Sequence, residues 1–340
     1  MAKSEKNYGV SLLKTMMCFE VLACHFLPYN DALIWQQPIH MLKTSAVPVF
    51  MLLSFLLCRG AVESGNPEAL KKRLKRLLWP HISWALVYYV GCLLLSFING
   101  EGFIGMDCLI WQLVTGSNER LNPAMWFQVD LIVLTAVFSL LFFRVNRRVG
   151  EEILLLTGAA CLVLQYSKIN FCLFEPLPDA VKYSLGRIVE VWPLAVAGVC
   201  LFRPGLLEWM KKHWVLGGFG SVCLCAAALA VKRICTIYDS FGYGGIHVLL
   251  VAVGMAGLFW CLPLERLGGR MTGLIDRLSR YTLGIYCEHL LVAKVFDAVL
   301  RRVGIPGEGF WFCVAVFAAS YLVSCLLERS GKRWLVAMVR

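Results

Sequence analysis

The stretch Lys14-Thr-Met-Met-Cys-Phe-Glu-Val-Leu-Ala-Cys-His25 lies inside the first strongly apolar run of the chain, from about Tyr8 to Leu27. A run of this length predicts a membrane-spanning helix, yet it carries three ionisable side chains, Lys14, Glu20 and His25. Charge in hydrocarbon is costly, so such residues usually face a protein interior or a polar cavity. At about 100° per residue, Lys14 and His25 share one face, roughly 16 Å apart along the axis, with Glu20 nearly opposite.

The rest of the chain repeats this apolar pattern. Its 340 residues are 59% hydrophobic, whereas a soluble domain is closer to half apolar. The apolar runs are about 17–24 residues long, the length that crosses a bilayer as a helix. We therefore predict a single all-α, polytopic membrane domain over residues 1–340, without a cleavable signal peptide. Its ten predicted spans are 8–28, 44–60, 78–99, 123–143, 152–167, 186–202, 213–231, 244–262, 281–300 and 309–327, and the short apolar segment 104–116 is predicted to be interfacial or re-entrant.

The net charge of +11 is explained by where the basic residues lie. If the N-terminus is cytoplasmic, the inner segments hold 22 Lys and Arg residues and the outer segments hold 8. Cytoplasmic loops are enriched in these residues, so the ratio predicts that both termini are cytoplasmic. The charge is thus a topology signal, and no nucleic-acid partner is predicted. The 15 cysteines show no CxxC or CxxH pattern, so no metal site is expected.

The segment Lys71-Lys-Arg-Leu-Lys-Arg-Leu-Leu-Trp-Pro80 lies in the predicted inner loop between the second and third spans. Six basic residues fall between positions 59 and 76, more than orientation alone requires. Arg73 and Arg76 would share a helix face, and guanidinium groups bind phosphate through paired hydrogen bonds. The segment is a candidate site for a phosphate-rich donor such as a coenzyme A thioester. The alternative, which composition alone favours, is a topological anchor that contacts anionic lipid headgroups.

Other polar residues in the predicted spans are weaker candidates. Ser54, in the second span, can satisfy backbone groups that a nearby proline frees. Asp130 lies one turn inside the fourth span, behind Trp126 at its outer boundary, and both a pairing role and a functional role are open. Arg187 and Glu190 are three residues apart, which predicts a local ion pair.

The ninth predicted span is unusually polar. It contains Tyr286, Glu288 and His289, followed by Lys294 and Asp297, which can pair locally. Glu288 and His289 are adjacent and point about 100° apart, so at least one of them faces the interior of the bundle. Tyr286, Glu288 and His289 are therefore second-tier site candidates.

Together these motifs resemble those of the integral-membrane acyltransferase family 3, whose members O-acylate cell-surface sugars. The first span of that family carries Arg or Lys, ten residues and then His, as Lys14 and His25 do here. The resemblance covers residues 8 to about 330, although Phe55 stands where the family usually has Gly, and Lys14 where Arg is commoner. The later motifs are matched in order by Pro48, Phe50 and Ser54, by Arg73, Arg76 and Pro80, by Trp126 and Phe127, and by Ser279, Thr282, Gly284, Ile285, Tyr286 and His289.

The resemblance implies an acyl-CoA-dependent O-acyltransferase of the plasma membrane that transfers an acyl group, which we expect to be acetyl, to an extracytoplasmic sugar or polysaccharide. Acyl-CoA would bind at Arg73 and Arg76, with Lys14 as a phosphate contact or counter-charge. His25, near the outer side, could be a general base or a transient acyl carrier. Glu20 would pair with a basic residue of a neighbouring span. The expected partners are acyl-CoA, the glycan and membrane lipid, with no bound cofactor; the acceptor, the acyl length and the oligomeric state stay open.

Two other classes of protein remain open on the sequence. A transporter that exports a lipid-linked sugar or a small metabolite would use the buried ionisable residues as a relay or substrate path. Transporters often contain two related halves, and no such repeat is visible in this chain. An accessory protein that only binds partners would tolerate substitution of both Lys14 and His25.

Overall fold

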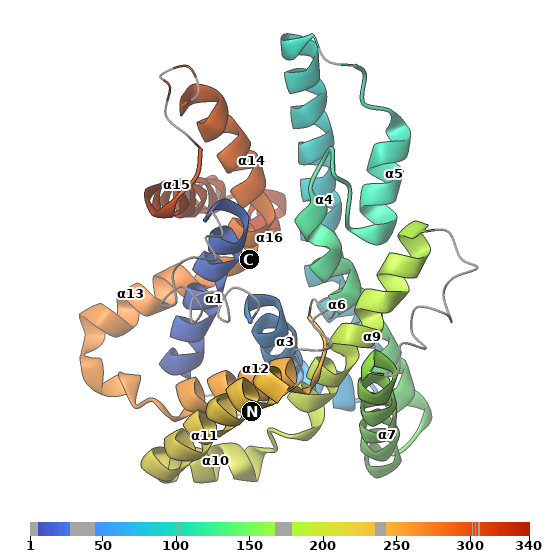
Figure 1. Cartoon of the computed structure of the whole chain (residues 1–340), viewed down its shortest axis with the longest axis vertical. Coiled ribbons are helices and arrows are strands. Elements are labelled where there is room, and N and C mark those ends of the chain that lie inside the picture. Colours follow the sequence, from blue (N-terminus) through green and yellow to red (C-terminus); the bar gives the residue numbers. More distant parts are fainter. Residues whose placement is uncertain are drawn as a thin grey trace.

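The computed structural model describes residues 6–27, 45–100, 102–166, 179–234, 243–300, 302, 304 and 307–340. These residues form fourteen α-helices and two short 3-10 helices, with no strand among them, which confirms the predicted all-α class (Figure 1). The helices are α1 (Tyr8–Phe26), α3 (Ala46–Glu63), α4 (Pro67–Asn99), α5 (Met106–Thr115), α6 (Trp126–Arg144), α7 (Arg147–Tyr166), α9 (Asp179–Cys200), α10 (Pro204–Lys212), α11 (Trp214–Ile234), α12 (Ile246–Cys261), α13 (Gly269–Arg280), α14 (Thr282–Leu300), α15 (Phe310–Arg329) and α16 (Arg333–Val339), with η1 (Pro123–Met125) and η3 (Leu264–Leu267).

Eight of the ten predicted spans coincide with helices that are long and apolar enough to cross a membrane. The other two coincide with α12, which has 16 residues, and with α14, which has 19 residues and contains Glu288, Lys294 and Asp297. Positions 28, 44 and 167, at the edges of predicted spans, lie outside the described residues. The chain is therefore an integral membrane protein with many apolar helices.

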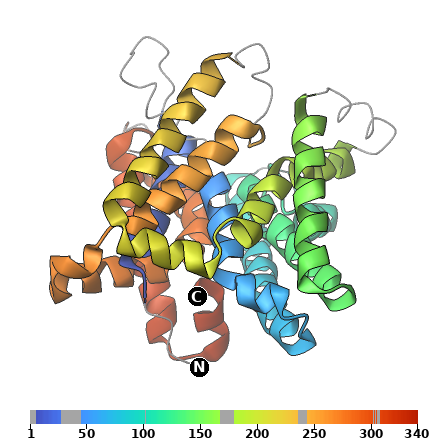
Figure 2. The same ribbon diagram turned by 90° about the horizontal axis from the view of Figure 1, so that it is seen from below.

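Helix ends that the charge pattern assigns to one side lie together. On the predicted cytoplasmic side, Asn7 before α1 donates to the carbonyl oxygen of Trp260 at the end of α12 (3.1 Å). On the opposite side, the amide of Gly309 before α15 donates to the carbonyl oxygen of Phe26 at the end of α1 (2.8 Å). These two contacts agree with the predicted directions of α1, α12 and α15, and Figure 2 shows the pair α11 and α12 side by side.

Small residues let the central helices approach closely, as in other membrane proteins. A Cβ atom on Gly198 of α9 would lie 2.4 Å from the carbonyl oxygen of Leu52 in α3. A Cβ atom on Gly9 of α1 would lie 1.8 Å from the carbonyl oxygen of Phe259 in α12. Only glycine fits at these two crossings, which hold α9 and α12 against the helices that carry the predicted site residues.

The basic segment before the third span is helical and is not the predicted loop. It forms the first turns of α4, which begins at Pro67 behind the N-cap Asn66 and continues through Pro80 to the left-handed Gly100. Proline at the first helical position needs no hydrogen-bond partner for its nitrogen, which suits it to that place. The helix therefore presents its cations on definite faces instead of in a flexible loop.

Segment 104–116, which we predicted to be interfacial or re-entrant, contains the short apolar helix α5. This helix runs beside α4 in Figure 1, and the carbonyl oxygen of Leu113 lies 3.0 Å from His81 Nε2 in α4. Its C-terminal carbonyl, on Thr115, accepts a hydrogen bond from Arg187 of α9 (3.1 Å). Interior partners thus satisfy the free carbonyl groups at the end of this short helix, as a nonpolar environment requires.

A buried ion cluster joins the inner ends of α3, α7 and α9. Arg59, 6% exposed, donates to Glu63 (2.6 Å), to Glu151 (3.3 Å) and to the carbonyl oxygen of Phe202 (3.1 Å). Arg203 reaches the second oxygen of Glu151 at 2.7 Å. Arg59 thus has a structural role. It does not belong to the candidate donor-binding site, although it was counted among the six basic residues between positions 59 and 76.

Candidate active site

A cavity of about 920 Å³ lies between α1, α3, α4, α6, α13 and α14. Its wall is strongly cationic, with Asp276 the one carboxylate among the residues that line it. Seven cationic side chains line it, from five separate segments of the chain: Lys6, Lys14, Lys72, Arg73, Arg76, Arg280 and Arg340. Like charges gathered in a low-dielectric cleft attract anions, so the cavity is built for a multiply charged anion.

The cavity unites five residues that the sequence predicted from separate spans. They are Lys14, Ser54, Arg73, Arg76 and Tyr286. Arg73 Nη2 donates a hydrogen bond to Ser54 Oγ, which ties α4 to α3. Lys14 Nζ lies 3.4 Å from the carbonyl oxygen of Ser279, the last turn of α13. Both cations are therefore held in place by neighbouring helices while they line the cavity.

The sequence alone did not identify the residues at the mouth of the cavity, which include Asp276 and Arg280. Asp276 is bound by Lys6 and lies 3.5 Å from Arg280 Nη2. The hydrogen bond from Lys6 holds the pKa of Asp276 below its usual range, although partial burial opposes this shift. Lys6, Arg280 and Arg340 resembled ordinary cytoplasmic anchors, and only the packing of α13 and α16 brings them to one opening.

The inner end of the cavity is aromatic. The ring of Phe127 lies 5.7 Å from that of Tyr286 and 6.3 Å from that of Phe50, measured between centroids. The Tyr286 hydroxyl donates to the carbonyl oxygen of Ala124, so this ring is fixed by a hydrogen bond and is 6% exposed. We call Phe50, Phe127 and Tyr286 the aromatic wall, because they separate the cationic chamber from the residues beyond.

Two histidines lie beyond the aromatic wall. The His25 and His289 rings are 5.4 Å apart, and the Tyr286 ring is 6.1 Å from that of His289. His289 is fully buried and its Nδ1 lies 2.7 Å from the carbonyl oxygen of Tyr286. A carbonyl can only accept, so Nδ1 carries the proton and Nε2 is left as an acceptor, with no hydrogen-bond partner among the described residues. His25 is exposed, in the last turn of α1.

The other predicted acidic residues have structural partners. Glu288, 1% exposed, accepts a hydrogen bond from Ser324 Oγ at 2.8 Å, which ties α14 to α15. We predicted a basic partner for Glu20, but none is found among the described residues. Instead, its carboxylate accepts from the amides of Ser45 and Ala46, each at 3.2 Å, and thereby caps the first turn of α3. Amides at a helix start are a favourable environment for a carboxylate, so no cation is needed.

The predicted local ion pair between Arg187 and Glu190 is also wrong. Arg187 instead approaches Asp130 of α6, with Nε 4.0 Å from Oδ2, and its guanidinium lies over the Trp126 ring at 5.1 Å. Likewise, Lys294 donates to the carbonyl oxygen of Leu121 at 3.1 Å in place of the predicted pair with Asp297. In both cases the polar group that lies nearest to the cation belongs to another segment of the chain, which helix packing brings close.

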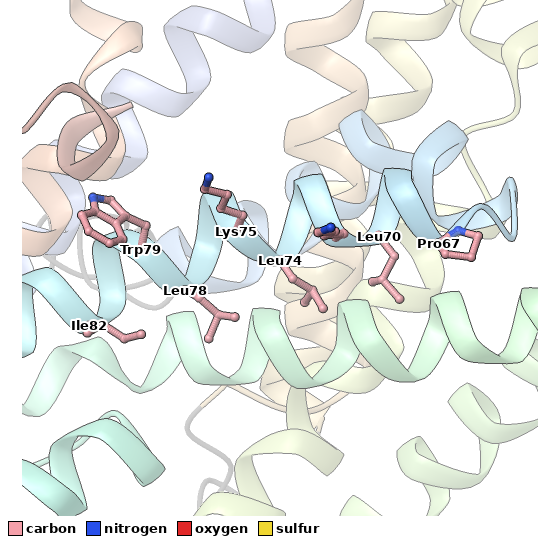
Figure 3. Close-up of a pocket in the computed structure, with 8 residues that line it drawn as sticks. Pro67, Leu70, Leu74, Lys75, Leu78, Trp79 and Ile82 are labelled. Atoms are coloured by element: carbon pink, nitrogen blue, oxygen red, sulfur yellow. The ribbon is translucent and has the colours of Figure 1, made fainter. Parts of the chain in front are cut away.

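A second hollow, of about 540 Å³, lies along the opposite side of the basic part of α4 (Figure 3). Figure 3 shows Leu70, Leu74 and Leu78 projecting together, while Lys75, which also lines the hollow, is directed away from them. All of the lining residues belong to α4: Pro67, Leu70, Lys71, Leu74, Lys75, Leu78, Trp79 and Ile82. Apolar side chains flanked by lysines suit a membrane boundary, where lysine stems lie along hydrocarbon and ammonium groups reach headgroups.

The acyltransferase family 3 model, described as an acyltransferase domain, matches residues 7–329. No curated protein and no solved structure gives a significant match. Within the described ranges, no group of three His, Cys, Asp or Glu residues is arranged to hold a metal ion.

Proposed function

Because this chain belongs to acyltransferase family 3 and is a membrane-embedded acyltransferase, we propose that its cationic cavity binds acyl-CoA. The acyl group, acetyl in our proposal, is passed to a hydroxyl of an extracytoplasmic sugar or polysaccharide at the plasma membrane. Lys14, Arg73 and Arg76 contact the donor, and His25 is the catalytic residue on the acceptor side.

The main support for this proposal is that a single cavity combines seven Lys and Arg side chains with an aromatic, apolar end. Coenzyme A has the same division, with its phosphates at one end and a long neutral arm that ends in the thioester. Phosphates suit the Arg and Lys side chains at the cytoplasmic mouth, where paired guanidinium contacts are strongest. The arm then extends toward Phe50, Phe127 and Tyr286, which favour a short acyl group because bulky rings close that end.

His25 supplies the proton acceptor that the transfer requires. The acceptor hydroxyl attacks the thioester carbonyl and forms the C–O bond, while His25 takes the hydroxyl proton. The C–S bond breaks, and the coenzyme A sulfur leaves and receives that proton from the imidazolium. His289 is a positioning residue, because its buried and correctly oriented ring lies 5.4 Å from that of His25.

The experiment uses purified protein in vesicles with radiolabelled acetyl-CoA and a membrane fraction of the producing cells as acceptor. We expect His25→Ala to lower the label transferred to glycan by at least about 100-fold. The control variant is His213→Ala, since His213 lies at the end of α10, away from the cavity. Full transfer by His25→Ala would overturn the proposal.

The same material separates the two roles open to His25. Without acceptor, a general base leaves the protein unlabelled, whereas an acyl carrier accumulates an acetyl label that His25→Ala abolishes. We expect no label on the protein. A stable label that depends on His25 would replace the general-base step by an acyl-enzyme step.

A further inference from the structure

A second polar cluster joins the first turns of α6, the middle of α9 and the residue Tyr243 shortly before α12. It consists of Trp126, Asp130, Arg187, Glu190 and Tyr243. The Trp126 and Tyr243 rings lie 5.1 Å apart at 41°, and the Arg187 guanidinium lies over the Trp126 ring. Both rings are partly exposed, so they offer aromatic surface at an accessible place.

The carboxylate of Asp130 in this cluster lacks hydrogen-bond partners among the described residues. The Asp130 side chain is 1% exposed, and neither of its carboxylate oxygens has a hydrogen-bond partner within the described structure. Arg187 Nε, 4.0 Å away, also lacks one. Buried charged groups without hydrogen bonds are unfavourable by several kcal/mol. A ligand hydroxyl between these groups would donate to Asp130 and relieve the deficit.

Aromatic faces beside carboxylates are the chemistry that recognises a sugar ring. The C–H face of a pyranose packs on an aromatic ring, and its hydroxyls donate to carboxylate oxygens. Within this cluster, Asp130 and Glu190 oppose a single cation, Arg187. An additional negative charge on the ligand would be repelled, which favours an uncharged sugar over a uronic acid or a sugar phosphate.

The cluster adjoins the aromatic wall and approaches the end of α1, which carries His25. Trp126 contacts Phe127 of the aromatic wall, with ring centroids 6.4 Å apart. Tyr243 lies within electrostatic range of Cys24, the neighbour of His25 in the chain. A sugar on these rings would therefore lie near His25 while the donor phosphates remain on the far side of Phe127 and Tyr286.

We infer that Trp126, Tyr243, Asp130, Arg187 and Glu190 form the acceptor site and that their ligand is an uncharged pyranose. This assignment rests on the proposed function for its place in the reaction. The binding of the sugar itself, however, can be measured without any acyl transfer.

The probes are radiolabelled methyl glycosides of glucose, galactose, mannose, rhamnose and N-acetylglucosamine, with methyl glucuronide as the charged counterpart of the glucoside. Equilibrium dialysis with the purified full-length chain measures their affinities. We expect at least one neutral glycoside to bind, and Trp126→Ala to weaken it at least about tenfold. The matched control is Trp311→Ala, since Trp311 is 79% exposed at the start of α15.

Trp126→Phe, which keeps an aromatic face, should restore part of the affinity, and an unchanged affinity of each variant for coenzyme A verifies its fold. The inference is overturned if no neutral glycoside binds, if methyl glucuronide binds as tightly as the best neutral probe, or if Trp126→Ala and Trp311→Ala bind alike. Sugar binding without acyl transfer would instead refute the proposed function and leave the site assignment intact.

Discussion

The cations of α4 provide the most direct test of the donor site, because they divide between two sides of one helix. Arg73 and Arg76 line the cationic cavity, whereas Lys71 and Lys75 line the apolar groove of Figure 3. Replacing any one of them by alanine removes one positive charge from the same short segment. A general surface charge effect would weaken coenzyme A binding equally in all four variants, but a built site would not.

The size of the effect follows from burial and hydrogen bonding. Arg73 is partly buried, its Nη2 is fixed by Ser54, and its Nε has no partner within the described residues. A charge-assisted hydrogen bond from such a group is worth about 1.5–3 kcal/mol, or roughly 10- to 150-fold in affinity. Arg76 is exposed, so screening limits its contribution to below about 1 kcal/mol, roughly fivefold or less.

The affinity of the purified variants for radiolabelled coenzyme A should therefore increase in the order Arg73→Ala, Arg76→Ala, Lys75→Ala. The last variant should bind as tightly as the unchanged protein. Raising the salt concentration should shrink the loss in Arg76→Ala more than that in Arg73→Ala, because exposed charges are screened. The reasoning is refuted if Lys75→Ala loses as much affinity as Arg73→Ala. Unchanged coenzyme A binding by Arg73→Ala would instead support the alternative that the basic segment of α4 only anchors the chain at the membrane surface.

Three further substitutions test the supporting structure. Glu20→Ala should destabilise the protein by about 1–3 kcal/mol, seen as a lower melting temperature, because two amides at the start of α3 lose their acceptor. Asp276→Asn should tighten coenzyme A binding about two- to fivefold by removing the carboxylate at the mouth. Since Lys6 lowers the pKa of Asp276, the carboxylate stays ionised from pH 5 to 8, so this gain should be constant over that range. A gain that vanished at pH 5 would contradict the pairing. Gly198→Ala should cost about 1–3 kcal/mol at the crossing of α3 and α9, whereas Gly205→Ala, with nothing within 4 Å, should not.

The sequence predicted the spans well because each is a long apolar run, and the length of such a run depends on the membrane more than on its neighbours. It also predicted which cations are candidates for the donor site. It could not distinguish Arg73 from Lys75, since both belong to one basic segment. Whether a side chain lines the cationic cavity or the apolar groove of Figure 3 depends on the direction in which it projects from α4.

Pairings between charged residues were predicted poorly for a related physical reason. The i, i+3 rule considers only neighbours on one helix, where Arg187 meets Glu190. In the folded chain, Arg187 meets Asp130 on α6 and the ring of Trp126. Glu20 likewise found backbone amides of α3 in place of a cation. Within an apolar bundle, a charged group is stabilised by whatever polar group packing brings close, and local spacing does not determine that partner.

The two ends of the Lys14–His25 face have different surroundings, and this difference bears on how transfer would proceed. Lys14 faces the cavity with six other cations, whereas His25 lies beyond the aromatic wall, beside His289. Coenzyme A phosphates would lose their cationic partners if they moved past Phe127 and Tyr286, so in the proposed reaction they stay on the Lys14 side. Only the end of the flexible neutral arm, with its acyl group, then needs to reach His25. A small rotation of the buried Tyr286 ring would break its hydrogen bond to Ala124 at a cost of about 1–3 kcal/mol, which still permits repeated opening during turnover.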